Sequence, residues 1–218
     1  MIARSEKLQT HFETFLENIN PVEFILIAFA SFISLLFHPM LISAFTFAVL
    51  IYSEKSSTQS PHLIFFIALL FSTLLSIAMV MYLRKKGIVS DADVSAREQR
   101  VKPLMIGALF NGIGFLVLRY MDASVLVQGL MFCYAFNTMI ISFISRYWKI
   151  SIHAIGLSGP LVALWLFGVQ FPVFMILAMV LLGVSRVILK SHTPAQVLAG
   201  TFLGLGLAYF QLTFLFLS

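Results

Sequence analysis

The sequence predicts an all-α fold, a polytopic membrane bundle of about six transmembrane helices that follows an N-terminal interfacial helix. Composition is the first indication: 60% of the 218 residues are hydrophobic and 11% are charged, whereas soluble domains are about 45–50% apolar and about 25% charged. Several apolar runs also approach the roughly 20 residues that a spanning helix requires. These runs are continuous and lack the alternation of membrane β-strands, so a β-barrel is not expected.

Residues 1–20 are predicted to form a separate amphipathic segment. Leu8, Phe12 and Phe15 recur at helical spacing, which favours a helix that lies in the membrane interface or packs on the protein itself. Acidic residues interrupt the segment, so a cleavable signal peptide is not expected. The remaining residues, 21–218, are predicted to form a single membrane-embedded domain.

The first apolar run, residues 21–53, is too long for one untilted span. It is interrupted by His38-Pro39, and proline removes a backbone donor and bends or breaks a helix. One kinked helix and a re-entrant pair of short helices are both compatible with this run. Further spans are predicted at residues 62–83, 104–119, 124–145, 153–169, 172–190 and 194–217. In the last span, close helix contacts are predicted at Gly200, Gly204 and Gly206.

The polar residues gather in three segments, 84–103, 145–153 and 185–192. Two predicted spans separate each segment from the next, so all three are expected at one face of the membrane. That face then carries most of the cations: Arg84, Lys85, Lys86, Arg97, Arg100, Lys102, Arg146, Lys149, Arg186 and Lys190. Because these charges lie at helix ends, the net charge of +5 indicates membrane topology or contact with anionic lipid headgroups rather than with nucleic acid.

Two histidines, His153 and His192, each begin a predicted span at this charged face. Fixed Arg and Lys side chains suit the oxygens of a phosphate group. One histidine can attack phosphorus, and a second can protonate the leaving oxygen. The residues therefore predict phosphoryl transfer without a metal, with an anionic lipid phosphate as the substrate.

The stretch "SRVILKSH" resembles a signature of the type 2 phosphatidic acid phosphatase superfamily. It matches the third motif of that family, S-R-x5-H-x3-D, at Ser185, Arg186 and His192. The similarity extends over about residues 84–205 and includes the order of the three family motifs. The chain is similar to a divergent prokaryotic branch of the superfamily.

The other two motifs are kept in part. "ISIH" resembles the second motif, P-S-G-H, and matches it at Ser151 and His153. The first motif, K-x6-R-P, corresponds to the segment that ends in Lys102-Pro103, where Ser95 stands in place of the family's lysine.

The resemblance implies an enzyme that forms a phosphohistidine at His192, with His153 as the general acid for the leaving group. It also implies a membrane helical core of the family type. Lys149 has no counterpart in the motifs and is a candidate to replace the missing lysine. The predicted phosphate-binding residues are Arg97, Arg100, Lys102, Lys149, Ser151, Ser185 and Arg186.

Gln196 stands where the family motif has aspartate, one helical turn after His192. Its side-chain carbonyl can accept a hydrogen bond from the histidine ring, but it cannot neutralise an imidazolium. Thr193-Pro194-Ala195-Gln196 also has the pattern of a helix capping box, with proline at the first helical position. Both uses of Gln196 are open, and Gln196 is a candidate catalytic residue.

A metal site is not expected, and neither is a cofactor. Asp91 and Asp93 invite comparison with Asp-rich loops that hold Mg²⁺, but such sites need enough carboxylates to bridge metal and diphosphate. Asp122, the other aspartate, is predicted at the opposite face. Asp93 is instead predicted to pair with Arg97, four residues further on. Two other histidines, His38 and His62, are predicted to be structural.

The predicted function is an integral membrane lipid phosphatase that needs no metal. Phosphatidic acid, phosphatidylglycerophosphate and polyprenyl phosphates or diphosphates all fit as substrates. One alternative is a non-catalytic relative that binds or moves anionic lipids, and another is a Mg²⁺-dependent prenyl or phosphatidyl transferase. The expected location is the plasma membrane of a prokaryotic cell. The sequence leaves open the side of the membrane on which the site lies, the choice of lipid and the oligomeric state.

Overall fold

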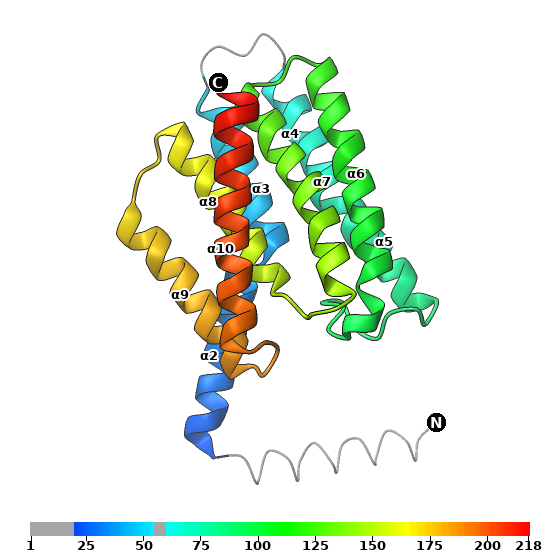
Figure 1. The fold of residues 1–218 in the computed structure, drawn as a ribbon, viewed down its shortest axis with the longest axis vertical. Helices are drawn as coiled ribbons and strands as arrows, with labels where there is room; N and C mark the ends of the chain where they lie inside the picture. Colours follow the sequence, from blue (N-terminus) through cyan, green and yellow to red (C-terminus); the bar gives the residue numbers. More distant parts are fainter. Residues whose placement is uncertain (1–19, 55–59) are drawn as a thin grey trace.

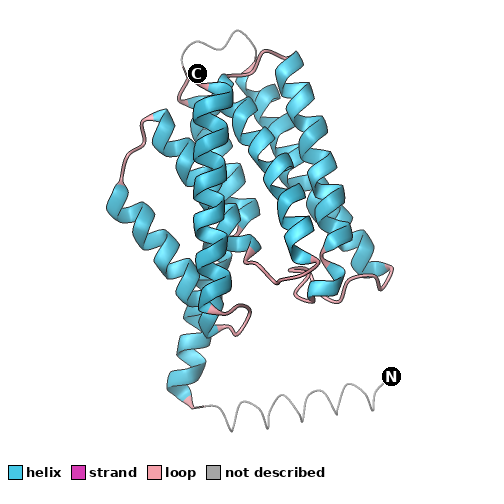
Figure 2. Ribbon diagram, in the orientation of Figure 1, coloured by secondary structure: helices cyan, strands magenta, loops and turns pink. Residues whose placement is uncertain are grey.

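The computed structural model describes residues 20–54 and 60–218, and within them every regular element is helical (Figure 2). The all-α prediction is therefore confirmed for this part of the chain. The interfacial helix predicted over residues 1–20 falls almost entirely outside it. Four helices are long and apolar enough to cross a membrane: Pro61–Lys85, Arg97–Tyr120, Val125–Ser145 and Pro194–Phe216.

A fifth span is present if the bent pair α2 (Pro21–Leu36) and α3 (Pro39–Tyr52) is taken as one. Two shorter apolar helices, α8 (Ile152–Phe167) and α9 (Pro172–Ile188), complete the set. The described residues thus have the helices of a membrane protein. The predicted number of about six spans stays a prediction.

The first apolar run is broken at His38-Pro39 and continues beyond the break. The bend between α2 and α3 is 40°, and α3 leads on toward the opposite end of the bundle (Figure 1). His38 adopts an extended conformation because proline disfavours a helical residue before it. Its ring nitrogen Nδ1 accepts a hydrogen bond from the Met40 backbone amide at 3.3 Å and so caps α3.

The remaining helices form two close pairs beside one long helix. α4 (Pro61–Leu69), a π-helical turn (Leu70–Leu74) and α5 (Leu75–Lys85) run on as one long element. α6 (Val101–Tyr120) packs along α7 (Val125–Ser145), and α8 packs along α10 (Pro194–Gln211), which continues as a π-helical turn, Leu212–Phe216. The pair α6/α7 is antiparallel, whereas the pair α8/α10 is parallel, with both starts at the same end of the bundle (Figure 1).

Small residues allow α8 and α10 to approach closely. A Cβ atom added at Gly200 would lie 2.8 Å from the Ser151 carbonyl oxygen, and one at Gly204 would lie 2.8 Å from the Ser158 Cβ. The predicted close contacts are therefore confirmed at these two glycines. Gly206 is different, because nothing lies within 4 Å of a Cβ placed there. The close pairing fixes the start of α10 against the start of α8, where Ser151, His153 and Gln196 lie.

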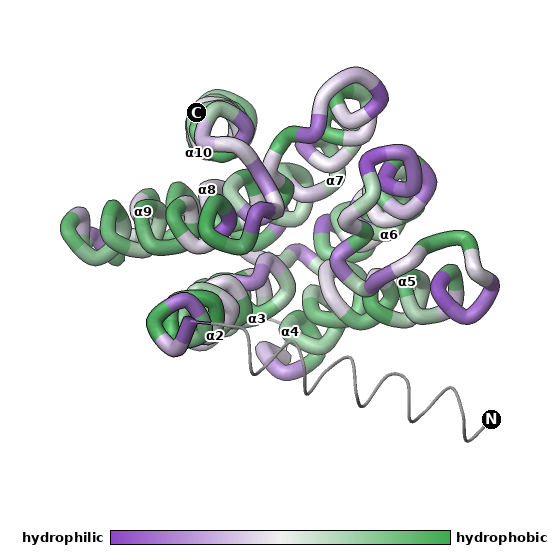
Figure 3. The backbone as a smooth tube through the Cα atoms, turned by 90° about the horizontal axis from the view of Figure 1, so that it is seen from below, coloured by the Kyte–Doolittle hydropathy of each residue, from purple (hydrophilic) through white to green (hydrophobic). Residues whose placement is uncertain are grey.

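The outside of the bundle is apolar, and the polar segments lie at its ends. Many large hydrophobic side chains are exposed, for example Val22, Leu109, Val173 and Phe202. Seen from below, the hydrophilic parts of the trace gather at loops and helix ends (Figure 3). An apolar belt of this kind suits lipid as the surrounding solvent.

The three polar segments of the sequence meet at one end of the bundle, opposite the C-terminus (Figure 1). The Arg97 guanidinium donates to the Tyr147 carbonyl at 2.9 Å, which links the first segment to the second. The Ser151 amide donates to the Gln196 carbonyl at 3.3 Å, which links the second to the start of α10. This end of the molecule therefore holds most of the residues that were predicted to form a site.

Candidate functional site

His192 lies in the short loop between α9 and α10, with its side chain 6% exposed. Its Nδ1 is 3.2 Å from the Lys149 carbonyl oxygen and 3.1 Å from the Gln196 Oε1. Both oxygens can only accept hydrogen bonds, so Nδ1 carries the proton in this arrangement. The neutral ring then has its lone pair on Nε2, which is the form that a nucleophilic histidine requires.

Gln196 serves both of the uses that the sequence left open. Its Oε1 lies against the ring of His192 and also accepts from the Thr193 backbone amide at 3.2 Å. The Thr193 hydroxyl in turn accepts from the Gln196 amide at 3.3 Å, which completes a capping box at the start of α10. One side chain therefore begins the helix and orients the candidate nucleophile.

The surroundings of His192 keep it neutral. Burial lowers the pKa of His192 to about 4, and the cations Arg100, Arg186 and Lys149 act in the same direction, while the hydrogen bond to Gln196 opposes them. Burial and the nearby Arg100 and Arg186 also lower the pKa of Lys149. The three cations therefore lie close enough together to act on one another and on this histidine.

Arg186 lies in the last turn of α9 and is 4% exposed. Its Nη1 donates to the Ser34 hydroxyl at 2.8 Å and lies 3.7 Å from Asp93 Oδ2. Its Nε has no hydrogen-bond partner among the described residues. A buried guanidinium with an unused N–H can donate it to an oxygen of a bound anion.

His153 is the second residue of α8 and is buried, and its Nε2 has no partner among the described residues. The ring lines a cavity of about 210 Å³, together with His38, Asp93 and Arg100. His192 and Arg186 are not among the lining residues. A ring that lines a cavity and has an unpartnered nitrogen is a candidate to exchange a proton with a ligand there.

The predicted pairing of Asp93 with Arg97 is wrong. Asp93 lies near Arg186 and near His38, whose Nε2 is 3.8 Å from Oδ1, whereas Arg97 contacts the adjacent Glu98 at 3.3 Å. An i,i+4 pair requires a helix, and residues 86–96 form a loop in which Val94 has a φ of 47°. The imidazole of His38 lowers the pKa of Asp93 to about 2, against the opposing effect of partial burial.

Arg97 and Arg100, both predicted to bind phosphate, hold the loops of the site together. Arg100 is buried, and its guanidinium donates to the carbonyls of Val94 at 2.9 Å and Ile150 at 3.2 Å. Arg97 makes the equivalent link to Tyr147. Of the two, Arg100 also lines the cavity, so it can reach a ligand as well as fix the loops.

Three other predicted phosphate-binding residues have different surroundings from those expected. The Ser151 hydroxyl caps α8 by accepting from the Ala154 amide at 3.4 Å. The Ser185 hydroxyl donates to the Leu182 carbonyl of its own helix at 2.7 Å. Lys102 is exposed in the first turn of α6. The hydroxyls of Ser151 and Ser185 therefore bond to the backbone of their own helices. The Ser151 hydroxyl lies beside a free amide of the first turn of α8, and the Ser185 hydroxyl lies beside a carbonyl of the preceding turn of α9.

His38, for which the sequence favours a structural role over a contact with the site, has both. It caps α3, and its ring also lies edge-on to His153, with 5.0 Å between ring centroids. The available signal was a His-Pro break inside an apolar run, because an ionisable residue within a membrane segment is commonly functional. His62, by contrast, contacts the Tyr52 hydroxyl at 3.0 Å.

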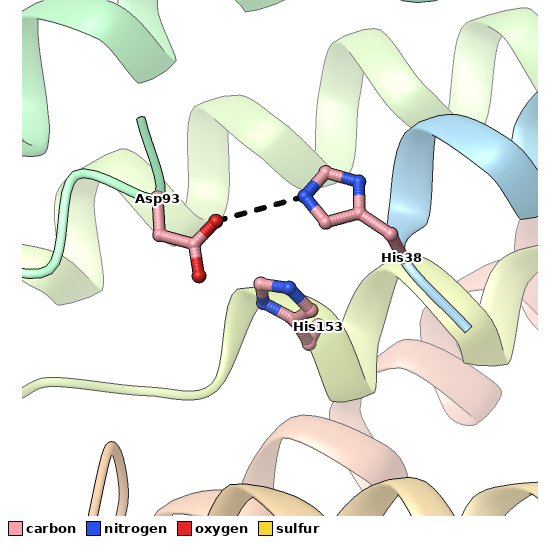
Figure 4. A group of neighbouring side chains, drawn as sticks. All are labelled: His38, Asp93 and His153. Carbon is pink, nitrogen blue, oxygen red and sulfur yellow. Dashed lines mark ion pairs between the residues drawn. The ribbon is translucent and has the colours of Figure 1, made fainter. Parts of the chain in front are cut away.

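His38, Asp93 and His153 form a compact trio (Figure 4), with one ligating atom of each within 4.8 Å of the others. Two histidines and a carboxylate are a common ligand set for transition metals. His38 is poorly prepared for that role, since its Nδ1 accepts from Met40 and the proton of the neutral ring is therefore on Nε2, toward Asp93. The Arg186 cation beside Asp93 also disfavours a second positive charge there.

Comparison with models of protein families, with curated proteins and with solved structures gave no match to this chain.

Proposed function

We propose that this protein is a membrane lipid phosphatase of the type 2 phosphatidic acid phosphatase kind, which transfers the phosphoryl group to His192. One observation carries the proposal. The Nδ1 of His192 is bonded to two acceptor oxygens, so the ring offers its lone pair at Nε2 in a cluster of cations at one end of an apolar helical bundle. The motif residues Ser185, Arg186 and His192 agree with this assignment.

In the first step, the lone pair of His192 Nε2 attacks phosphorus and the bond from phosphorus to the lipid oxygen breaks. His153, protonated at its unpartnered nitrogen, gives its proton to the leaving oxygen. Arg186 and Arg100, with Lys149, stabilise the charge on the other phosphate oxygens. The products of this step are a lipid alcohol and a phosphohistidine.

In the second step, water attacks the phosphohistidine and neutral His153 takes the proton from that water. The bond between phosphorus and His192 breaks, inorganic phosphate leaves, and both histidines return to their starting states. Gln196 holds the ring of His192 in one orientation through both steps. No carboxylate contacts that ring among the described residues, so the positive charge that develops on it is compensated less well than in the family motif.

The test is release of phosphate from lipid substrates by the purified protein in detergent or liposomes that contain EDTA. Phosphatidic acid, phosphatidylglycerophosphate and a polyprenyl phosphate are compared, and His192→Ala is the control. Release by the wild type in EDTA and none by the control would support the proposal. Release that requires Mg²⁺ would favour a transferase or hydrolase of another class.

Gln196 supports a second candidate function, the binding or movement of anionic lipids without hydrolysis. The residue fixes the His192 ring but supplies no negative charge to an imidazolium. Saturable binding of phosphatidic acid, without release of phosphate, would favour this function. The same preparation can be used for both measurements.

A further inference from the structure

We propose that Asp93 and His38 are positioning residues for His153, an inference that rests on the proposed phosphatase function. In this assignment the Asp93 carboxylate stabilises the protonated ring of His153, and His38 holds that carboxylate in place. The result is a carboxylate–histidine arrangement on the general acid, whereas the proposed nucleophile has Gln196 in the place of a carboxylate.

The geometry brings together residues from three distant segments. His38 caps α3, Asp93 lies in the loop before α6, and His153 is at the start of α8. One polar atom of each lies within 4.8 Å of the others, and the carboxylate faces both rings (Figure 4). All three residues line the same cavity, so a ligand in that cavity meets them as a group.

The backbone of α3 fixes the role of His38. Because Nδ1 accepts from the Met40 amide, the neutral ring carries its proton on Nε2. That N–H is directed at Asp93 Oδ1, 3.8 Å away, and the Arg186 guanidinium approaches the other carboxylate oxygen at 3.7 Å. Asp93 is therefore held from two sides and remains ionised at neutral pH.

His153 needs a nearby negative charge to keep a proton. Its ring is buried, and burial disfavours the charged form. Among the described residues, the charged or titratable groups that act on it are Arg186, His38, His192 and Asp93. Asp93 is the only one of these that is negative. Burial and Arg186 disfavour the protonated ring more strongly than Asp93 favours it, so loss of Asp93 would leave none of these groups in favour of the proton that the leaving oxygen requires.

The proton balance is the same as in the proposed mechanism. Protonated His153 gives its proton to the leaving oxygen as the bond from phosphorus to that oxygen breaks and the bond to His192 forms. Neutral His153 later takes a proton from the attacking water. Asp93 and His38 exchange no proton with the substrate in either step, and their effect on the rate passes through His153.

The experiment compares two substrates that differ in their need for a general acid. Dioleoyl phosphatidic acid has a poor alkoxide leaving group, and p-nitrophenyl phosphate has a good one. We expect Asp93→Asn to lower kcat on the lipid by roughly 10²-fold and on the aryl phosphate by less than about 3-fold. Asp93→Glu should retain part of the kcat on the lipid that Asp93→Asn loses, since glutamate keeps the negative charge beside His153.

Two further variants accompany Asp93→Asn: the first is a control for the structure of the loop, and the second tests the role of His38. Asp91→Asn removes the neighbouring carboxylate of the same loop, which accepts from the Ser95 amide at 3.0 Å and from the Ser95 hydroxyl at 3.1 Å and is not among the described groups that act on His153. It should change the rates on both substrates by the same factor. His38→Asn keeps a side chain that can cap α3 but removes the N–H that faces Asp93, and it should repeat the leaving-group selectivity of Asp93→Asn.

Equal losses on both substrates in Asp93→Asn would overturn the inference and leave the phosphatase function intact. Loss of activity in EDTA that added Zn²⁺ restores would also overturn it, because the trio would then be a metal site. Absence of phosphate release by the wild type from either substrate would contradict the proposed function itself, and the inference with it.

Discussion

Replacing Gln196 by glutamate tests how the proposed nucleophile, His192, is controlled. Glutamate has the length of glutamine, so it can keep both the contact with His192 Nδ1 at 3.1 Å and the contact with the Thr193 amide at 3.2 Å. It is also a preferred residue at this position of a capping box. The substitution therefore changes the charge beside the ring while it preserves the helix start.

The contact distance between the glutamate carboxylate and the His192 ring sets the size of the expected pKa shift. An opposite charge in direct contact raises the pKa of an imidazole by roughly 1–3 units, so the pKa of His192 should rise from about 4 to roughly 5–7. This corresponds to about 1.4–4 kcal/mol of stabilisation of the charged ring. If half of that charge has developed in the transition state, turnover should increase roughly 3- to 30-fold near pH 8.

The assay is the pH dependence of kcat for release of phosphate from a lipid phosphate, measured for the wild type, Gln196→Glu and Gln196→Leu. The acid limb of the glutamate variant should lie at higher pH, because its ring takes up a proton more readily and protonated His192 cannot attack. The leucine variant should be slower than the wild type. If the glutamate variant folds and both its turnover and its acid limb are unchanged, Gln196 has no part in catalysis.

Three further predictions concern other parts of the chain. His153→Ala should slow turnover of a lipid phosphate by roughly 10²–10⁴-fold and that of an aryl phosphate much less, and equal losses would show that His153 only shapes the site. Gly204→Ala should cost about 1–3 kcal/mol of stability in detergent, because its Cβ would lie 2.8 Å from Ser158 Cβ, whereas Gly206→Ala, with open space around it, should not. The pKa of His192 is lower in the folded protein than the ordinary 6.5, so its contribution to stability is full above pH 6.5 and is lost as the pH falls toward 4. The apparent Tm should therefore decrease over that interval, and His192→Asn should remove part of the decrease, whereas an unchanged decrease would show that His192 does not contribute.

The all-α bundle of apolar helices and the gathering of the polar segments could be predicted from the sequence, because both depend on local composition. Apolar runs give the helices, and counting the crossings places residues 84–103, 145–153 and 185–192 at one end. The capping box at Thr193 and Gln196 could also be predicted, since its residues are close in sequence. These features need no knowledge of how distant helices pack.

The partners of Asp93 could not be predicted in the same way. The carboxylate reaches His38 and Arg186 through a loop with a left-handed residue at Val94, and those partners lie far from it in the sequence. The roles of Ser151 and Ser185 also depend on local geometry, since a hydroxyl beside a helix end or an intrahelical carbonyl bonds to it. Sequence motifs place such residues near a site without fixing what their side chains contact.

The most direct test of the account is the capture of the phosphoryl group on His192. The purified protein is mixed with ³²P-labelled phosphatidic acid in EDTA, quenched in alkali, in which a phosphohistidine survives, and digested for mass spectrometry. The account predicts an acid-labile phosphoryl group on the peptide that contains His192, together with unlabelled diacylglycerol, and no label in His192→Ala. Release of phosphate without label on this peptide, or in undiminished amount from the His192→Ala protein, would contradict it.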